Sequence, residues 1–260
     1  MPIEEKAKII DSEQVAKEHF KITFFSPYIS SHATPGQFLH VRCGSSSYPL
    51  LRRPLSIHNV IRDKKEVQIL FKVVKAGTKI LSELKAGDRL DVLGPLGNGF
   101  KINTSKKVAI LVGGGYGIAP LLYLAQEMKG KIKAIYAFIG AKSKDYILCE
   151  QDFKNLGVEV VIGTEDGSAG KKCLICEPVN EILSSKIIEE ETEIFACGPY
   201  GMLKELADIA LEKKVPCQVS MEEKMACGIG TCLGCVTKTK EGYKKACEDG
   251  PVFDSRDIIW

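Results

Sequence analysis

The sequence predicts an antiparallel β-barrel, then an α/β domain with a parallel sheet, then a small cysteine-rich segment. Three observations support this prediction. Short strands separated by turn residues fill residues 1–100, strands then alternate with helices, and cysteine and glycine become frequent from Pro216. The expected domain boundaries are residues 1–103, 104–215 and 216–260.

The first part contains short strands with regular turn signals between them, such as Pro27, Pro35-Gly36 and Asp63-Lys64. This pattern is typical of a small closed barrel. A short helix is expected at Thr78–Leu84. Strands are expected at Lys6–Ile10, Phe20–Phe24, Gln37–Arg42, Leu55–Val60, Val67–Val74 and Arg89–Val92, and a Gly/Pro-rich turn at Gly94–Gly99.

Beyond Ser105 the pattern becomes that of βαβ units, which build a parallel sheet. The apolar strand Val108–Val112 precedes a glycine cluster and a helix at Pro120–Met128. Further strands are expected at Lys131–Ile139, Val158–Ile162 and Glu193–Ala196, and further helices at Ala141–Cys149, Pro178–Ser184 and Gly201–Glu212.

The overall composition argues against several classes of protein. The 36 basic and 33 acidic residues nearly balance, and the lysines are not interleaved with aromatic residues, so nucleic-acid binding is not expected. No apolar run approaches the roughly 20 residues that a membrane helix needs. The N-terminus has no signal-peptide core. We therefore expect a cytoplasmic protein that binds neither nucleic acid nor membrane.

Ten cysteines are many for 260 residues. Without a secretory signal, reduced thiolates that hold a metal or cluster explain them better than disulfides. Cys227, Cys232 and Cys235 have the C-x4-C-x2-C spacing of plant-type [2Fe–2S] loops, and a hairpin around Lys240–Gly242 would return Cys247 as the fourth ligand. The alternative is a structural zinc site, which usually shows paired CxxC units. The single Cys247 favours the cluster.

Other cysteines and the histidines give no comparable pattern. Cys173 and Cys176 form a CxxC pair, but Glu177-Pro178 follows them and they have no obvious partner pair, so both are interpreted as thiols without a role. No metal-ligand spacing connects the four histidines, which are His19, His32, His40 and His58.

Two turns have the composition of a nucleotide site. Glycines between a strand and a helix let backbone N–H groups approach a phosphate, and the helix N-terminus favours the anion. The first turn contains Gly113, Gly114, Gly115 and Gly117 before Pro120. The second, Cys197-Gly198-Pro199, also follows a strand, where ligands bind in parallel sheets. The alternatives are a tight turn in the first case and a packed thiol in the second.

The barrel contains a third motif, Arg53-Pro54-Leu55-Ser56. Because proline has a fixed φ angle, a strand that starts there can present Arg53 and the Ser56 hydroxyl on a rigid wall. The planar guanidinium group suits a diphosphate, and a hydroxyl can hydrogen-bond to a flavin ring edge. An Arg-Pro pair before a strand is also compatible with a purely structural role.

The order of these motifs resembles the ferredoxin–NADP reductase superfamily, in which the barrel binds FAD and the second domain binds the nicotinamide nucleotide. The cysteine segment, with the ending Cys247–Phe253 that runs on to Trp260, looks like one branch. That branch contains the electron-transfer subunits of NAD-linked dihydroorotate dehydrogenases. The resemblance spans essentially the whole chain.

The resemblance implies roles for residues at matching positions. Ser56 and Cys197 would act at the reacting groups. FAD would contact Arg53, Pro54, Leu55, Ser56, Leu70, Phe71, Lys72, Gly77 and Thr78. NAD would bind at Gly113, Gly114, Gly115, Gly117, Cys197, Gly198 and Pro199. Cys227, Cys232, Cys235 and Cys247 would ligate the cluster.

The resemblance also implies a function. A catalytic partner would oxidise dihydroorotate on its own FMN, and electrons would pass through [2Fe–2S] and FAD to NAD+ in pyrimidine biosynthesis. The implied assembly is a heterotetramer of two copies of each chain, with Met225, Ile229 and Leu233 as candidates for contact with the partner. One alternative is the same reductase module in a hydrogenase or an electron-bifurcating transhydrogenase. Another is a non-catalytic, zinc-stabilised nucleotide-binding subunit.

The residues leave the choice of nucleotide open. Lys142 and Lys144 follow the strand that ends near Gly140 and would suit the 2′-phosphate of NADP. Glu165 and Asp166 follow another strand and would suit the free ribose hydroxyl of NAD. The family resemblance implies NAD.

Overall fold

The structure is a computed structural model that describes residues 1–44, 48–184 and 191–260. The chain divides into two compact units. The first comprises residues 1–99, 222–237 and 243–251, and the second comprises residues 100–221, 238–242 and 252–260. Residues 216–260 are thus shared between the two units. No helix in the described ranges is long and apolar enough to cross a membrane.

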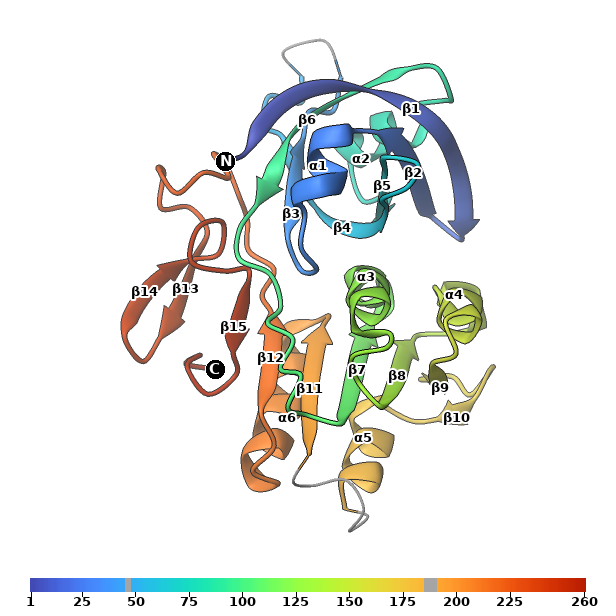
Figure 1. The fold of residues 1–260 in the computed structure, drawn as a ribbon, viewed down its shortest axis with the longest axis vertical. Coiled ribbons are helices and arrows are strands. Elements are labelled where there is room, and N and C mark those ends of the chain that lie inside the picture. The colour runs from blue at the N-terminus through green and yellow to red at the C-terminus, as the bar shows by residue number, and fades with distance from the viewer. Residues whose placement is uncertain (45–47, 185–190) are drawn as a thin grey trace. The chain divides into compact units, whose positions relative to one another are not determined.

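A closed antiparallel barrel forms the main part of the first unit (Figure 1), as predicted. Its strand order is β1-β2-β5-β4-β3-β6. Side chains that alternate along the strands fill the barrel, and Ile22, Ile57 and Ile69 are completely buried. The strands are β1 (Ile3–Ala16), β2 (His19–Phe25), β3 (Phe38–Val41), β4 (Arg53–Ile61), β5 (Glu66–Lys72) and β6 (Arg89–Leu96).

Several details of the first unit differ from the prediction. Strand β1 runs from Ile3 to Ala16, well beyond the expected Lys6–Ile10, and the short helix spans Ala76–Ser82 in place of Thr78–Leu84. A helix, α1 (Pro27–His32), stands where only a turn was expected, because Ser26 Oγ accepts the Ile29 N–H at 3.1 Å and caps it. The turn predicted at Gly94–Gly99 is wrong in its first half. Strand β6 continues to Leu96, because Leu96 pairs with Phe38 of β3.

The second unit is built on a seven-stranded sheet in the order β10-β9-β8-β7-β11-β12-β15 (Figure 1). Neighbouring strands are parallel except β15, which runs antiparallel to β12. This confirms the predicted parallel sheet. The strands are β7 (Val108–Gly114), β8 (Ala134–Ala141), β9 (Glu159–Thr164), β10 (Lys171–Lys172), β11 (Thr192–Cys197), β12 (Cys217–Ser220) and β15 (Val252–Asp254).

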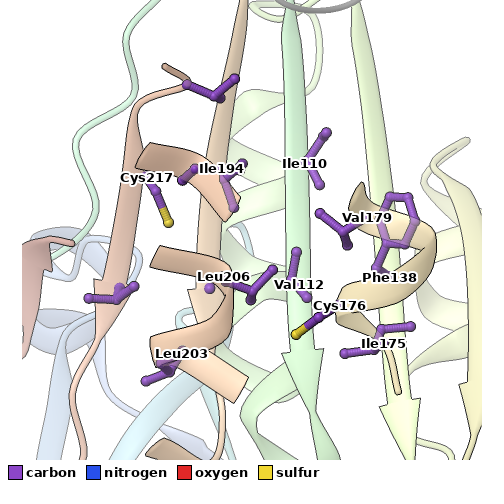
Figure 2. Close-up of a cluster of buried hydrophobic side chains, with 14 of the residues drawn as sticks. Ile110, Val112, Phe138, Ile175, Cys176, Val179, Ile194, Leu203, Leu206 and Cys217 are labelled. Atoms are coloured by element: carbon purple, nitrogen blue, oxygen red, sulfur yellow. The ribbon is translucent and has the colours of Figure 1, made fainter. Parts of the chain in front are cut away.

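Helices cover the sheet. Figure 2 shows α5 (Cys176–Leu183) and α6 (Tyr200–Glu212) packed on one face, where Ile110 and Val112 of β7 meet Leu206. The alternate residue Leu111 is equally buried and points to the opposite face. A single turn, η1 (Gly115–Ile118), leads from β7 into α3 (Ala119–Met128), which is almost wholly buried.

The helix predicted at Ala141–Cys149 is wrong. Strand β8 continues to Ala141, because Ala141 pairs with Thr164 of β9. A single turn, η2 (Lys144–Tyr146), follows, and α4 begins only at Glu150 and ends at Asn155. Cys149, with a φ of 62°, has a left-handed backbone that an α-helix cannot contain.

The hairpin expected around Lys240–Gly242 is confirmed. Strands β13 (Val236–Thr239) and β14 (Gly242–Lys245) pair with each other on either side of this turn. The chain thereby returns Cys247 toward Cys235, and the Ala246 N–H donates to the Cys235 carbonyl at 2.8 Å.

Candidate functional site

The strand that carries the Arg53–Ser56 motif, β4, is partly accessible over that stretch and again at its last residue, Ile61. Residues 53–56 are each half-buried, whereas residues 57–60 are buried. The neighbouring strand β5 contributes Leu70 and Phe71, which are buried, and Lys72, which is half-buried. Two of the stretches expected to contact FAD therefore lie on adjacent strands.

A third stretch meets the first at the start of α2 (Ala76–Ser82). A Cβ atom on Gly77 would lie 2.9 Å from Arg53 Nε, so the glycine permits the guanidinium to lie against this backbone. Thr78 Oγ1 accepts the Val74 N–H at 2.8 Å and shapes the turn that leads into the helix. A guanidinium beside backbone N–H groups is an arrangement that favours a diphosphate.

The glycine turn after β7 packs against the turn after β11. The two strands are neighbours, and Gly113 is in register with Cys197. A Cβ atom on Gly114 would lie 2.7 Å from Pro199 Cδ, and one on Gly117 would lie 2.3 Å from the Cys197 carbonyl oxygen. The two stretches expected to bind NAD thus form one surface at the carboxyl edge of the sheet, where ligands bind in such folds.

The backbone of this surface is open at Gly115. Gly115 has a φ of 55°, and no atom lies within 4 Å of the position that its Cβ would take. Cys197, at the end of β11, is half-buried. Ser56 and Cys197, the two residues expected at the reacting groups, belong to the first and the second unit respectively.

A hydrogen-bonded chain joins the loops that follow β8 and β9. The Lys144 N–H donates to Ser168 Oγ at 2.8 Å, and Ser168 Oγ donates to Asp166 Oδ1 at 2.6 Å. The Ser168 hydrogen bonds lower the pKa of Asp166, which follows β9 at the carboxyl edge of the sheet.

The four cysteines of the C-terminal segment all belong to the first unit and gather as two pairs. Cys232 donates its N–H to Cys227 Sγ at 3.4 Å, and the thiols of Cys235 and Cys247 are in hydrogen-bonding contact. Nowhere in the described ranges do three His, Cys, Asp or Glu side chains converge as one metal ion requires. Two pairs of thiols are the donor set that a two-iron cluster takes up, with two thiolates on each iron.

Backbone N–H groups point at the sulfurs. Burial opposes ionisation of Cys227, but hydrogen bonds led by the Ile229 N–H lower the pKa of its thiol to about 6. Burial and the neighbouring Cys235 raise the pKa of Cys247 to about 12, although the Gly230 N–H donates to its Sγ at 3.1 Å. N–H donors of this kind stabilise the thiolates of an iron–sulfur cluster.

Asn98 ties the segment that carries Cys247 to the barrel. Its Nδ2 donates to the backbone oxygens of Glu248 at 2.9 Å and Asp249 at 3.1 Å, and its own N–H donates to the Gly250 oxygen at 2.5 Å. Sequence reasoning missed Asn98, because asparagine in a Gly/Pro-rich turn already has a local explanation.

Lys245 connects the segment that carries Cys247 to the loop of residues 227–235. Its Nζ donates to the Gly230 oxygen at 3.0 Å and forms an ion pair with Glu248. A Cβ atom on Gly230 would lie 2.6 Å from Glu248 Oε2, so the glycine allows the loop and the acidic side chain to approach. The spacing of the cysteines gives no signal for this contact.

The buried pair of cysteines rests in a small apolar cluster. Cys235 and Cys247 pack there with Ala246 and with Phe38 and Leu96 of the barrel. Met225, a candidate for contact with the partner, is half-buried and packs against this cluster. The other two candidates are exposed, Ile229 by 54% and Leu233 by 64%.

All ten cysteines are free thiols. Cys173 and Cys176 are buried, and burial raises the pKa of both thiols, that of Cys176 to about 12. A buried thiol with a raised pKa is unreactive. Cys176 also opens helix α5, two residues before the predicted start.

Family models match three successive parts of the chain. Residues 6–100 match an oxidoreductase FAD-binding domain, and residues 111–208 match an oxidoreductase NAD-binding domain. Residues 222–259 match the iron-sulfur cluster binding domain of dihydroorotate dehydrogenase B. The fold and the site therefore define an oxidoreductase with FAD-binding, NAD-binding and iron–sulfur domains, which confirms the predicted cofactors.

Similar proteins narrow the class to a family. The dihydroorotate dehydrogenase B (NAD(+)) electron transfer subunit of Desulforamulus reducens is 41% identical, over 98% of this chain and 97% of that protein. The corresponding subunit of Caldanaerobacter subterraneus subsp. tengcongensis is also 41% identical, over 98% of each chain. The chain belongs to the family of dihydroorotate dehydrogenase B (NAD(+)) electron transfer subunits.

Solved structures of other reductases share the fold of this chain. The structure of an NADH-dependent reduced ferredoxin-NADP oxidoreductase, described for flavin-based electron bifurcation, matches with a TM-score of 0.88 and 31% identity. It covers 98% of this chain and 90% of that one. A ferredoxin NADP+ reductase from Neisseria gonorrhoeae covers 81% of this chain and 91% of that one, with a TM-score of 0.68 and 16% identity, and shows the shared fold.

Proposed function

We propose that this chain carries electrons from the FMN of a catalytic dihydroorotate dehydrogenase subunit to NAD+, in pyrimidine biosynthesis. The observation that supports this most directly is that all four cysteines belong to the same compact unit as the barrel that matches an FAD-binding domain, with Cys235 and Cys247 packed against that barrel. A bound cluster supplies single-electron transfer, and bound FAD supplies the exchange between single electrons and a hydride.

The chain's own residues bind and orient these groups. Arg53 and the backbone at Gly77 hold the FAD diphosphate, and the Ser56 hydroxyl hydrogen-bonds to the flavin ring edge. Pro54 and Leu55, with Leu70, Phe71 and Lys72, line the flavin site, and Thr78 shapes its helix turn. Cys227, Cys232, Cys235 and Cys247 ligate the cluster.

In the second unit the turn from Gly113 to Gly117 offers N–H groups to the NAD phosphates, and Cys197, Gly198 and Pro199 orient the nicotinamide. The ionised Asp166 favours the free ribose hydroxyl of NAD over a 2′-phosphate. We assign FAD binding to residues 1–103, NAD binding to residues 104–215 and cluster binding to residues 216–260.

The name of the family implies a catalytic partner subunit. We propose that this partner contains FMN, that two copies of each chain assemble, and that the complex is cytoplasmic. Ile229 and Leu233 are exposed beside the proposed cluster ligands, and we propose that they contact the catalytic partner subunit. Changing both residues to glutamate would then weaken assembly, and an intact complex after this change would contradict the contact.

Anaerobic co-purification with the catalytic subunit tests the function. We expect about one FAD and two irons per copy of this chain, and dihydroorotate-dependent reduction of NAD+ that requires both chains. NADP+ would be reduced more slowly. A colourless protein that contains zinc would contradict the proposal.

The alternative function is that of an electron-bifurcating reductase module. It is favoured by the structural match to the NADH-dependent reduced ferredoxin-NADP oxidoreductase, with a TM-score of 0.88. A coloured complex that contains FAD and iron, ignores dihydroorotate and exchanges electrons between NADH and ferredoxin would support it.

A further inference from the structure

His40 belongs to the barrel and contacts the loop of residues 227–235, which carries three of the proposed cluster ligands. It is part of β3, where its backbone is in register with Pro54 of β4 on one side and Leu93 of β6 on the other. Its ring lies against the loop, because a Cβ atom on Gly228 would be 2.6 Å from His40 Nδ1. His40 therefore connects β3, the neighbour of the strand with the Arg53–Ser56 motif, to Gly228, which follows the proposed ligand Cys227.

The surroundings of this imidazole are unusual for a polar group. The residue is 1% exposed, and neither ring nitrogen has a hydrogen-bond partner among the described residues. Burial lowers its pKa, and the Arg52 charge lowers it further, against smaller contributions from the backbones of Cys227 and Arg52. These two backbones approach the ring without completing a hydrogen bond. A buried polar group without a partner requires an explanation.

Gly228 is matched to this ring. Its φ of 71° lies in the left-handed region that other residues rarely adopt, and a side chain there would collide with the imidazole. Both properties let the Cys227–Gly228 turn lie directly on His40. A neutral imidazole carries one N–H donor and one acceptor, so it can serve this turn without adding charge beside the cysteines.

We propose that His40 is a positioning residue, which holds the Cys227–Gly228 turn against the barrel and, once the cluster is bound, completes a hydrogen bond from its ring N–H to the Cys227 backbone. The proposal rests on the proposed function, since it requires a cluster on Cys227. Backbone N–H groups of this loop, led by that of Ile229, hydrogen-bond to the Cys227 thiol. Because hydrogen bonds to the sulfurs help to set the reduction potential of an iron–sulfur cluster, the position of the turn affects that potential. His40 would thus tune the half of the cluster that is held by Cys227 and Cys232.

The test uses the complete complex with three variants: His40→Leu, His40→Gln and His58→Leu. His58 is the matched control, because it is buried in the same barrel and is 2% exposed. The measurements are iron and FAD content, the electron paramagnetic resonance spectrum of the reduced cluster, and its midpoint potential. None of these depends on turnover.

We expect His40→Leu to change the spectrum and shift the midpoint potential to a more negative value, or to lose iron while FAD stays bound. His40→Gln keeps an N–H donor, so its spectrum, potential and iron content should be closer to those of the unchanged protein. The same three properties of His58→Leu should equal those of the unchanged protein. A spectrum, potential and iron content unaffected by His40→Leu would overturn the proposal, as would equal effects of His40→Leu and His58→Leu. If the complex without any substitution contained no iron, the proposed function itself would be contradicted.

Discussion

Asn98 and Glu248 are 150 positions apart in the sequence, and the Asn98 side chain donates a hydrogen bond of 2.9 Å to the Glu248 backbone oxygen. This contact fastens the residue after the fourth proposed cluster ligand, Cys247, to the end of the barrel. All four cysteines and the barrel therefore belong to one compact unit. The spacing between flavin and cluster would then be set within that unit alone.

Asn98→Ala should loosen the cluster. The change removes two side-chain hydrogen bonds to the segment after Cys247, and each contributes on the order of 1 kcal/mol. Together they contribute about 2 kcal/mol, so we expect iron to be lost to a chelator roughly thirtyfold faster, with FAD retained. Asn103→Ala, at an exposed position of the second unit, is the control. Equal rates of iron loss in the two variants would contradict this role for Asn98.

Gly77→Ala should weaken FAD binding. The added methyl group would lie 2.9 Å from Arg53 Nε and displace the guanidinium from the helix start. We expect the Kd for FAD, measured by titrating the stripped complex, to rise about tenfold, equivalent to ~1.4 kcal/mol. Gly201→Ala places a methyl group in open space and serves as the control. An unchanged Kd for FAD in Gly77→Ala would contradict the assignment of the FAD diphosphate to this position.

Cys227→Ser and Cys247→Ser should each abolish the cluster, because either change removes one thiolate of a two-thiolate pair. The measurement is the visible absorption and the iron content of the anaerobic complex. Cys149→Ser changes a half-buried cysteine outside residues 216–260, and this variant should keep both the visible absorption and the iron content. A cluster of normal spectrum in Cys227→Ser would show that the ligands have been assigned wrongly.

Glu193 should make stability depend on pH. Burial raises its pKa, against weaker effects of a Gln218 hydrogen bond and the Lys106 charge, while Asp254 adds to the rise. A raised folded-state pKa means that this contribution to stability is complete below the unfolded value of about 4.3 and is lost as pH rises through the folded value. Glu193→Gln should therefore flatten the fall of Tm with rising pH. The same slope in both proteins would contradict this.

The local motifs could be predicted because each lies within one short stretch of chain. The spacing of Cys227, Cys232 and Cys235 reflects how one loop wraps a cluster. The glycine turn at Gly113–Gly117 reflects the sharp passage from a strand to a helix. The alternation of strands and helices likewise follows from hydrophobic periodicity and turn residues.

Predictions failed where partners distant in the sequence decided the local structure. The helix predicted at Ala141–Cys149 fits its own residues, but pairing with Thr164 extends β8 and delays the helix. The turn predicted from Gly94 fits its glycine and proline, but pairing with Phe38 keeps the chain extended to Leu96. Hydrogen bonds between strands overrode local preference in both cases.

Residue types and their spacing along the chain were enough to predict the fold class, the family resemblance and the four candidate cysteines. The folded chain adds that Cys235 and Cys247 pack against the barrel and that Asn98 and His40 contact the segment that carries the cysteines. These contacts join residues far apart in sequence, and the apolar cluster in which Phe38 and Leu96 of the barrel pack with Cys235 and Cys247 holds the returning chain in place. No local spacing encodes such a meeting, since it depends on how the whole chain folds.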